Sequence, residues 1–286
     1  MQFLQRKNLR GMEMMLEPSV RHPAVAGAFY PDDPVELREM IEDYLSKSEE
    51  VKLKSRGKAK LRALIVPHAG YIYSGPIAAY GYKLLANYKE TVKDVILLGP
   101  SHYAGFSGIC ESGFGFWETP LGRLKSASIK EKLSEADGKM IASYPQAHLP
   151  EHSLEVQLPF IQSVLKDDVT VYPLLCGDAN PEMFADVLEK AVDDNTIFIV
   201  SSDLSHYLTY DKAVKTDKVA NTSIPKKDIE RFTEKGDACG KTPILILLNI
   251  AEKKGWKGKL LNYRNSGDTA GDKIRVVGYG CYAFYE

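Results

Sequence analysis

The sequence predicts a single α/β domain, a layered sandwich with a mixed, largely parallel central sheet and helices on both faces. Short apolar runs alternate with helical patterns over most of the 286 residues, which is typical of parallel strands covered by helices. Two strand-like runs near the C-terminus have little sequence between them, which indicates an antiparallel pair. No long Ser/Gly/Pro tract, low-complexity segment or internal repeat marks a linker in the sequence.

The N-terminal half of the predicted domain begins with a helix. Residues 32–34 (Asp-Asp-Pro) supply an acidic cap and then a proline at an early position, where its missing N–H does no harm. Apolar side chains then recur at helical spacing from Leu37 to Leu45. Pro159 conflicts with a later helix and predicts a kink or a delayed start there. The elements predicted after the first helix are a strand at 63–67, a helix at 75–88, a strand at 95–99, a turn at Gly122 and a helix at 153–165.

The C-terminal half continues the alternation of strands and helices. Because its last two strands are close in the sequence, we expect them to be antiparallel neighbours, which makes the sheet mixed. All of these elements belong to one domain, residues 21–286. The elements predicted in this half are a strand at 169–175, a helix at 182–192, a strand at 197–200 with a further helix after it, an apolar helix at 243–252, and strands at 259–263 and 273–285.

Residues 1–20 are expected to be an N-terminal extension outside this domain. Charged residues interrupt their apolar residues, so the segment lacks the continuous apolar core of a secretory signal. Met12, Met14 and Met15 offer later natural starts for the chain. We therefore base the fold on the residues that follow.

Composition and charge exclude several classes of function. The formal net charge of -1 gives no overall attraction to nucleic acid, and no apolar stretch is long enough to span a bilayer. We therefore expect neither a nucleic-acid nor a membrane partner. The cysteines are scattered without a CxxC pair, which predicts a reduced, cytoplasmic protein rather than a disulfide framework. They are Cys110, Cys176, Cys239 and Cys281.

Titratable side chains follow three of the predicted strands. His68 and His102 each come just after a strand, and Asp203 and His206 follow a third. In an open α/β sheet, ligands bind at the carboxyl ends of the strands, so these side chains share one site if the strands are neighbours. A lone histidine more often serves structure. The matching positions of His68 and His102 nevertheless favour a partial metal site, because imidazole is the commonest side-chain metal ligand.

Cys239 lies just before the apolar helix predicted at 243–252. The N-terminus of that helix and the nearby Lys241 are both expected to favour the thiolate. A thiolate binds metals and attacks carbon, whereas an inert thiol is an equally common role for a cysteine at such a position. The sequence leaves both roles open.

Two further histidines extend this candidate site. Asp203 and His206 stand three residues apart, and they suit a ligand pair, a general base with its orienting acid, or a simple helix cap. His152 lies before a predicted helix that Ser153 is expected to cap, and we expect it to hang over the site. His148 is expected to be exposed.

Several common motifs are absent from the sequence. It contains no GxxxxGK[ST] phosphate loop, no HExxH and no GxGxxG between a strand and a helix, so nucleotide cofactor binding is disfavoured. Aromatic side chains are candidates for a pocket lining, although core packing is the more common role for any one of them. They are Tyr71, Tyr73, Tyr103, Trp117 and Tyr207.

Six strings in one order make the sequence similar to the Memo family, whose prokaryotic members are called AmmeMemoRadiSam system protein B. The similarity runs from about residue 21 to the C-terminus, and the motifs are specific as a set rather than singly. They are residues 21–31 (RHPAVAGAFYP), 67–71 (PHAGY) with Ser74-Gly75, 98–102 (LGPSH), 151–155 (EHSLE), 201–206 (SSDLSH), and Cys239-Gly240 before Pro243.

The resemblance implies a particular metal site. The family is similar in fold to the class III extradiol non-haem iron dioxygenases, which bind Fe(II) with two histidines and a glutamate. It places the histidines on His68 and His102 and the third position on Cys239. Thiolate is softer than carboxylate and favours copper or zinc, so ordinary dioxygenase chemistry is less expected. Animal members of the family are associated with metal-linked redox chemistry and with phosphopeptide binding, and for this chain the resemblance implies an available pocket rather than that peptide partner. The prokaryotic name of the family implies a link to radical SAM and AMMECR-type proteins.

The leading hypothesis is a metal-binding, oxidoreductase-like protein. His68, His102 and Cys239 hold iron or copper, with zinc as a further candidate, while His206, oriented by Asp203, acts as acid or base and His152 lines the pocket. One alternative is a metal-free Cys-His-Asp hydrolase that uses Cys239 as its nucleophile. The other is a non-catalytic module that binds a small molecule or peptide in the cleft at the strand ends.

Overall fold

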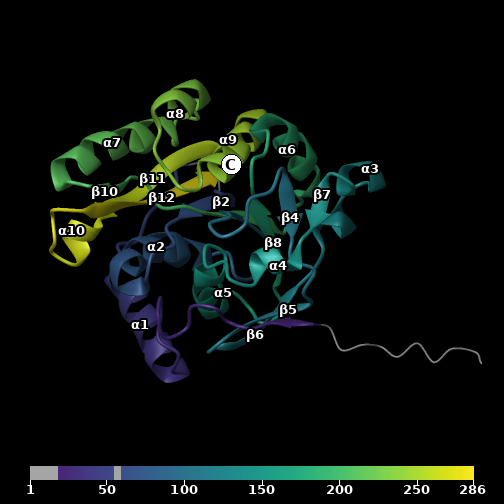
Figure 1. The fold of residues 1–286 in the computed structure, drawn as a ribbon, viewed down its shortest axis with the longest axis horizontal. Helices are drawn as coiled ribbons and strands as arrows, with labels where there is room; N and C mark the ends of the chain where they lie inside the picture. The colour runs from purple at the N-terminus through teal and green to yellow at the C-terminus, as the bar shows by residue number, and fades with distance from the viewer. Residues whose placement is uncertain (1–18, 55–58) are drawn as a thin grey trace, which may run out of the picture.

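The central feature of the computed structural model, which describes residues 19–54 and 59–286, is one mixed sheet (Figure 1). The 12-stranded sheet has the strand order β1-β5-β6-β8-β3-β9-β2-β12-β10, with β11, β4 and β7 paired off this path. This confirms the predicted single α/β domain. Of the predicted extension, residues 1–18 lie outside the described residues, whereas Val20 pairs with Phe116 in the sheet.

The strands and helices have the following bounds. The strands are β1 Val20–Arg21, β2 Leu61–Val66, β3 Asp94–Pro100, β4 Ile109–Glu111, β5 Phe116–Thr119, β6 Gly122–Ser126, β7 Ile141–Ser143, β8 Thr170–Cys176, β9 Thr196–Ser201, β10 His206–Leu208, β11 Lys257–Asn265 and β12 Val276–Tyr285. The helices are α1 Pro34–Lys47, α2 Tyr71–Ala86, α3 Glu135–Gly138, α4 Pro145–His148, α5 Leu158–Val164, α6 Pro181–Leu188, α7 Tyr210–Ser223, α8 Ile229–Lys235, α9 Lys241–Lys253 and α10 Ser266–Thr269.

The centre of the sheet is parallel and its flanks are antiparallel. Strand β3 pairs in parallel with β8 and β9, and β9 pairs in parallel with β2. The predicted antiparallel pair at the C-terminus is confirmed, since β12 is antiparallel to both β11 and β2. Strands β2, β9 and β3 are therefore adjacent, and they all end at the same edge of the sheet.

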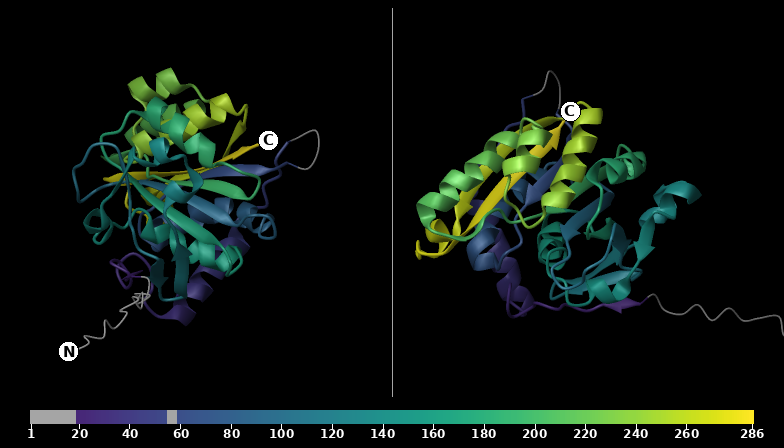
Figure 2. Two further views of the ribbon diagram at one scale, coloured as in Figure 1. Left: turned by 90° about the vertical axis from the view of Figure 1, so that its right-hand side faces the viewer. Right: turned by 45° about the horizontal axis from the view of Figure 1, so that its top comes forward.

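Helices cover both faces of the sheet, as Figure 2 shows where the sheet is seen nearly edge-on. Side chains of α1, α2 and α5 form one apolar core, and side chains of α6 to α9 form the other. Strand β2 contributes to both, because Leu64 and Val66 face the first core and Ala63 and Ile65 face the second. This two-sided burial explains why the central strands are continuous apolar runs.

Local sequence sets several helix boundaries. The side chain of Asp33 caps α1 by accepting from the backbone N–H groups of residues 35 and 36, as predicted. The predicted start of the helix at residue 153 is wrong, because α5 begins at Leu158 with Pro159 in its first turn. A 3₁₀ turn at Glu155–Gln157 precedes it, and the side chain of Ser153 donates to the carbonyl of Pro100 instead of capping a helix. Pro159 thus delays the helix start, as its missing N–H requires.

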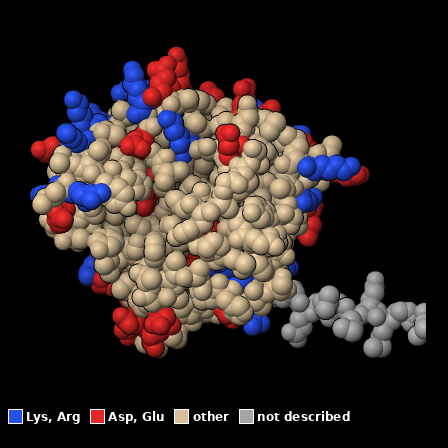
Figure 3. All heavy atoms as spheres, in the orientation of Figure 1, with Lys and Arg blue, Asp and Glu red and all other residues tan. Residues whose placement is uncertain are grey.

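The distribution of charged side chains on the surface agrees with the net charge of -1. On the face seen in Figure 1, acidic and basic side chains lie mainly toward the edges and an uncharged region lies between them (Figure 3). No helix within residues 19–54 and 59–286 is both long enough and apolar enough to cross a membrane.

Candidate metal centre

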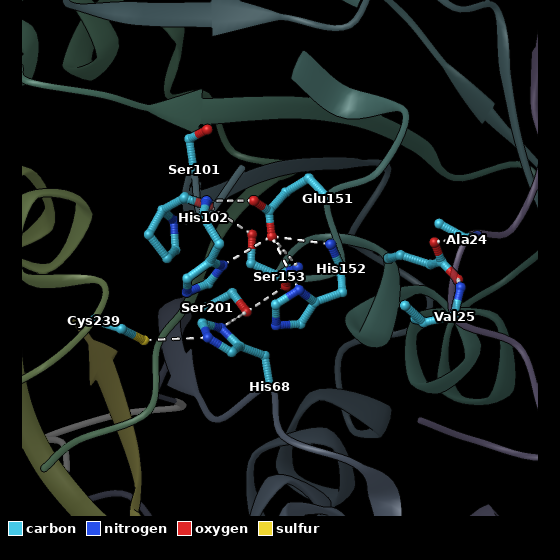
Figure 4. A network of polar contacts seen from close by, with 12 residues as sticks. Ala24, Val25, His68, Ser101, His102, Glu151, His152, Ser153, Ser201 and Cys239 are labelled. Carbon is cyan, nitrogen blue, oxygen red and sulfur yellow. Dashed lines mark hydrogen bonds and ion pairs between the residues drawn. The ribbon is translucent and has the colours of Figure 1, made fainter. Parts of the chain in front are cut away.

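The adjacent ends of β2, β9 and β3 bring distant residues together (Figure 4). His68 follows β2, Asp203 follows β9 and His102 follows β3, so the parallel strands deliver all three to one edge. Cys239 reaches the same edge from the turn before α9. The condition on which the sequence-based site depended, that these strands are neighbours, is met.

His68 is buried, and its hydrogen bonds define its tautomer. The Ser201 hydroxyl donates to the carbonyl of Ser153 at 2.5 Å and accepts from the side-chain amide of Gln157 at 2.8 Å. Its remaining contact, to His68 Nδ1 at 2.9 Å, therefore needs a proton on that nitrogen. Burial, followed by the neighbouring His102, lowers the pKa of His68 well below 6.5. The ring is thus neutral, with a free lone pair on Nε2.

His102 is held by a buried carboxylate. Its Nδ1 lies 2.9 Å from Glu151 Oε1, and its backbone N–H donates to Glu151 Oε2 at 2.6 Å. The backbone N–H groups of His152 and Ser153 also donate to Glu151. Burial of Glu151 opposes its ionisation, but these hydrogen bonds, that from the His102 ring foremost, lower its pKa to about 2. An ionised Glu151 only accepts, so Nδ1 of His102 carries the proton and Nε2 is free.

Cys239 is half-buried beside Asp203. Its Sγ accepts from the backbone N–H of Asp203 at 3.3 Å. Gly240 is required next to it, because an added Cβ would lie 2.6 Å from Ser202 Cβ. Burial, with Asp203 as a lesser cause, raises the pKa of Cys239 to about 12. The expectation that the helix start and Lys241 favour the thiolate is wrong, since Lys241 donates to the carbonyl of Gly236 and burial prevails.

The free donor atoms of these residues converge. Nε2 of His68 lies 3.2 Å from Sγ of Cys239, and one ligand atom each of His68, His102 and Cys239 all lie within 4.8 Å of one another. Ligands around a tetrahedral ion stand roughly 3.5 Å apart for bonds of about 2.0 to 2.3 Å. Two imidazoles and a sulfur in this arrangement fit copper, zinc or iron. Glu151 also lies near His102 and His152, but its oxygens are already committed to N–H donors.

His152 lies over the candidate metal centre. Its ring stacks on His102, with 4.7 Å between ring centroids and 21° between the planes, and it contacts Phe29 at 4.8 Å. Its Nδ1 has no hydrogen-bond partner within the described residues. Burial lowers the pKa of His152, so the ring is neutral and can accept a proton at neutral pH.

The structure does not pair Asp203 with His206. The Asp203 carboxylate accepts from the backbone N–H groups of His68 and Ala69, and no hydrogen bond to His206 is formed in the described part of the chain. Burial raises the pKa of Asp203 to about 7. His206 lies in β10 and lines the same cavity as His68, His102 and Cys239, and burial lowers its pKa. Asp203 thus positions His68 rather than the predicted acid/base residue.

A cavity of about 970 Å³ opens in front of these residues. Its size is at the upper end of the range of small-molecule sites. Three of the candidate aromatic residues line it, namely Tyr73, Tyr103 and Tyr207. The other two, Tyr71 and Trp117, belong to the core.

The support for this site includes a buried ion pair that the sequence analysis missed. Arg21 forms an ion pair with Glu155, and both side chains are fully buried. The Arg21 guanidinium also donates to the carbonyls of His148, Leu149 and Glu151, the last at 2.7 Å. Arg21 thus fixes the loop that carries Glu151 and His152. The charged residues in the strings 21–31 and 151–155 were the available signal.

Glu155 in turn ties the chain segment after β1 to this loop. It accepts from the backbone N–H groups of Ala24 and Val25 and from the hydroxyl of Tyr30, at 2.8, 3.0 and 2.6 Å. The hydrogen-bonding capacity of the buried Glu155 carboxylate is therefore used, and its charge is balanced by Arg21.

His148 is fully buried, so the expectation that it is exposed is wrong. Burial lowers its pKa from 6.5 to about 4. Between these values the unfolded chain binds the proton and the folded chain does not, so stability falls as the pH drops below 6.5. We expect His148 to reduce the free energy of unfolding by about 2 kcal/mol between pH 7 and pH 5.

Urea unfolding of the protein and of His148→Gln at both pH values checks this prediction. The other histidines and Asp203 are common to the two proteins, so the difference between their pH profiles isolates His148. Identical profiles would contradict the prediction. His22→Gln is a suitable control, because the His22 side chain is exposed beside Glu118.

Comparisons with known proteins agree with the motifs at this site. The model of the family described as Memo-like protein matches residues 21–283. A MEMO1 family protein of Sulfolobus acidocaldarius is 38% identical over 280 residues, which cover 91% of this chain and 97% of the relative. One of Saccharolobus solfataricus is 38% identical over 277 residues, with the same two coverages. One of Nitrosopumilus maritimus is 34% identical over 275 residues, covering 93% and 99%. This chain therefore belongs to the Memo family.

Proposed function

We propose that this protein binds a redox-active metal ion, iron or copper, and acts as an oxidoreductase on a small molecule in the cavity. His68 and His102 would bind the ion through Nε2 and Cys239 through Sγ. The observation that carries the proposal is that Nε2 of His68, which carries no proton because Nδ1 donates to Ser201, lies 3.2 Å from Sγ of Cys239. Zinc would fit the same donors but would not supply redox chemistry.

The surrounding residues have distinct tasks in this proposal. A bound ion would supply Lewis acidity and electron transfer. Glu151 and Ser201 hold the two imidazoles in the tautomer that presents Nε2. His152 and His206 line the cavity as neutral imidazoles and can take a proton from a bound substrate.

Metal analysis of protein purified without oxygen tests the metal site. We expect about one ion per chain, and almost none in His68→Ala, because the two ligands that remain bind an ion much more weakly than three. His22→Ala is the matched control, since His22 is an exposed histidine on another strand end. A metal-free wild-type protein that takes up neither iron nor copper would overturn the proposal. Metal binding and ligand affinity without any turnover would instead favour a non-catalytic binding module.

The hydrolase alternative is disfavoured by the surroundings of Cys239. Its thiol is protonated at neutral pH in the metal-free protein, and Asp203 does not orient His206. We therefore expect Cys239 in chelator-treated protein to react with iodoacetamide at pH 8 more slowly than free cysteine, because only the thiolate attacks. Mass spectrometry of the alkylated peptide measures this rate. Rapid alkylation of Cys239 that chelators do not change would favour the hydrolase.

A further inference from the structure

One wall of the cavity carries a row of three side chains from β10 and the chain just before β12. The ring of His206 lies 5.8 Å from the ring of Tyr207, and the guanidinium of Arg275 lies 5.0 Å from the Tyr207 ring centroid. All three line the cavity that the metal ligands also line. Among the described residues around this cavity, Arg275 is the only arginine or lysine.

Tyr207 owes its position to a bulge in the sheet. His206 pairs with Val277 and Leu208 with Val276, so Tyr207 is an extra residue between two paired positions. Its φ of 59° lies in the left-handed region, which a tyrosine rarely adopts. The side chain is 63% exposed. Bulges beside functional sites re-aim a side chain, and this one places an aromatic ring beneath Arg275.

The charge of Arg275 is not neutralised by a carboxylate. Within the part of the chain that the structure describes, no acidic side chain forms an ion pair with it. Asp272 also lines the cavity, but it accepts from the backbone N–H of Ile274 at 2.9 Å. Arg38, Arg231 and Arg264 also form no ion pair in the described part of the chain, but none of them lines this cavity. The N–H groups of Arg275 are therefore available to a ligand.

The chemistry of this wall selects a type of ligand. A guanidinium binds a carboxylate through two parallel hydrogen bonds, and an aromatic ring beneath it holds it in place. A single positive charge matches one carboxylate better than a dianionic phosphate. Elsewhere the lining is rich in aromatic rings, from Phe29, Tyr73, Tyr103 and Tyr279. Such rings favour a flat, apolar body.

We propose that the cavity binds an organic monocarboxylate with a flat apolar body. Its carboxylate pairs with Arg275 on the Tyr207 ring, and its other end points toward His68, His102 and Cys239. The orientation toward the metal ligands rests on the proposed function, whereas the carboxylate subsite does not. Arg275 and Tyr207 are then specificity-determining residues.

Fluorine NMR with 4-fluoroaryl carboxylates tests the subsite in metal-free protein. The probes are acids with one to four methylenes between ring and carboxylate, with the matching amides and 4-fluorophenyl phosphate beside them. We expect at least one acid to bind more tightly than its amide, and Arg275→Gln to weaken it about tenfold, as loss of a charge-assisted pair implies. Tyr207→Asn should also weaken it, because asparagine tolerates the left-handed backbone but provides no ring.

Lys273→Gln is the matched control. Lys273 also stacks on a tyrosine, Tyr210, but does not line the cavity, so its loss should leave the affinity unchanged. The proposal is overturned if no acid binds, if acid and amide bind equally, or if Arg275→Gln has no effect. Tighter, Arg275-dependent binding of the phosphate would overturn the carboxylate assignment.

A second arm tests the orientation. With Cu²⁺ bound, the paramagnetic ion should broaden the fluorine signal of the bound acid far more than Zn²⁺ does. Arg275-dependent binding without such broadening in copper-loaded protein would overturn the orientation. If the protein takes up no metal at all, the proposed function fails, while the Arg275 dependence in metal-free protein still decides the subsite.

Discussion

Replacing Arg21 by methionine is expected to lower the free energy of unfolding by about 3 to 5 kcal/mol, because it leaves a buried charge without its partner. Arg21 and Glu155 both have fully buried side chains, so removal of the guanidinium takes the cationic partner from a buried carboxylate. The carbonyls of His148, Leu149 and Glu151 also lose their donor. Urea unfolding monitored by circular dichroism at pH 7 measures this loss.

Two further variants make the test specific. Arg123 pairs with Glu118 at the surface, so Arg123→Met should cost less than about 1 kcal/mol. Arg21→Met combined with Glu155→Gln should be more stable than Arg21→Met alone, because glutamine removes the unpaired charge and keeps one oxygen for the N–H of Val25 and the hydroxyl of Tyr30, a gain that exceeds the loss of the hydrogen bond from Ala24. A double variant no more stable than Arg21→Met would show that the buried charge is not the cause.

The fold could be predicted because its central strands carry a strong local pattern. Strands buried on both faces are continuous apolar runs, and β2, β3, β8 and β9 all have this pattern. The short strands β1, β4, β5, β6, β7 and β10 were not predicted. Each has at most five residues, and so short a run carries little periodicity.

The candidate metal ligands could be predicted from the sequence, and the residues that support them could not. His68 and His102 follow strands, and parallel strands place their carboxyl ends together whatever their order. The adjacency of β2, β9 and β3 is a property of the whole sheet, which the local sequence does not encode. The same holds for the pKa of Cys239, which depends on burial by segments distant in the sequence. Lys241 was a misleading local signal for this reason.

The second large effect is expected on metal affinity when the Glu151 carboxylate is removed. Glu151→Gln is expected to weaken metal binding by about 10- to 100-fold, as loss of a hydrogen bond to a ligating histidine does. The carboxylate accepts from Nδ1 of His102 at 2.9 Å, so the lone pair of the ring that can bind a metal is on Nε2. A glutamine carries no charge, and either orientation of its amide places the NH₂ group against backbone N–H donors, that of His102 on one side or those of His152 and Ser153 on the other. The hydrogen bond that holds Nδ1 of His102 is therefore weakened, and the ring is less firmly oriented toward the metal.

Competition with a chelator of known affinity measures this change, and urea unfolding of the metal-free variant shows whether the fold is intact. Glu111→Gln is the matched control, since Glu111 is also buried but pairs with Lys130 and Ser128 away from the cavity. An unchanged metal affinity in a stable Glu151→Gln protein would contradict the role of the carboxylate. A weakened affinity in a stable variant would show that Glu151, on the loop that Arg21 holds, prepares His102 to bind the metal.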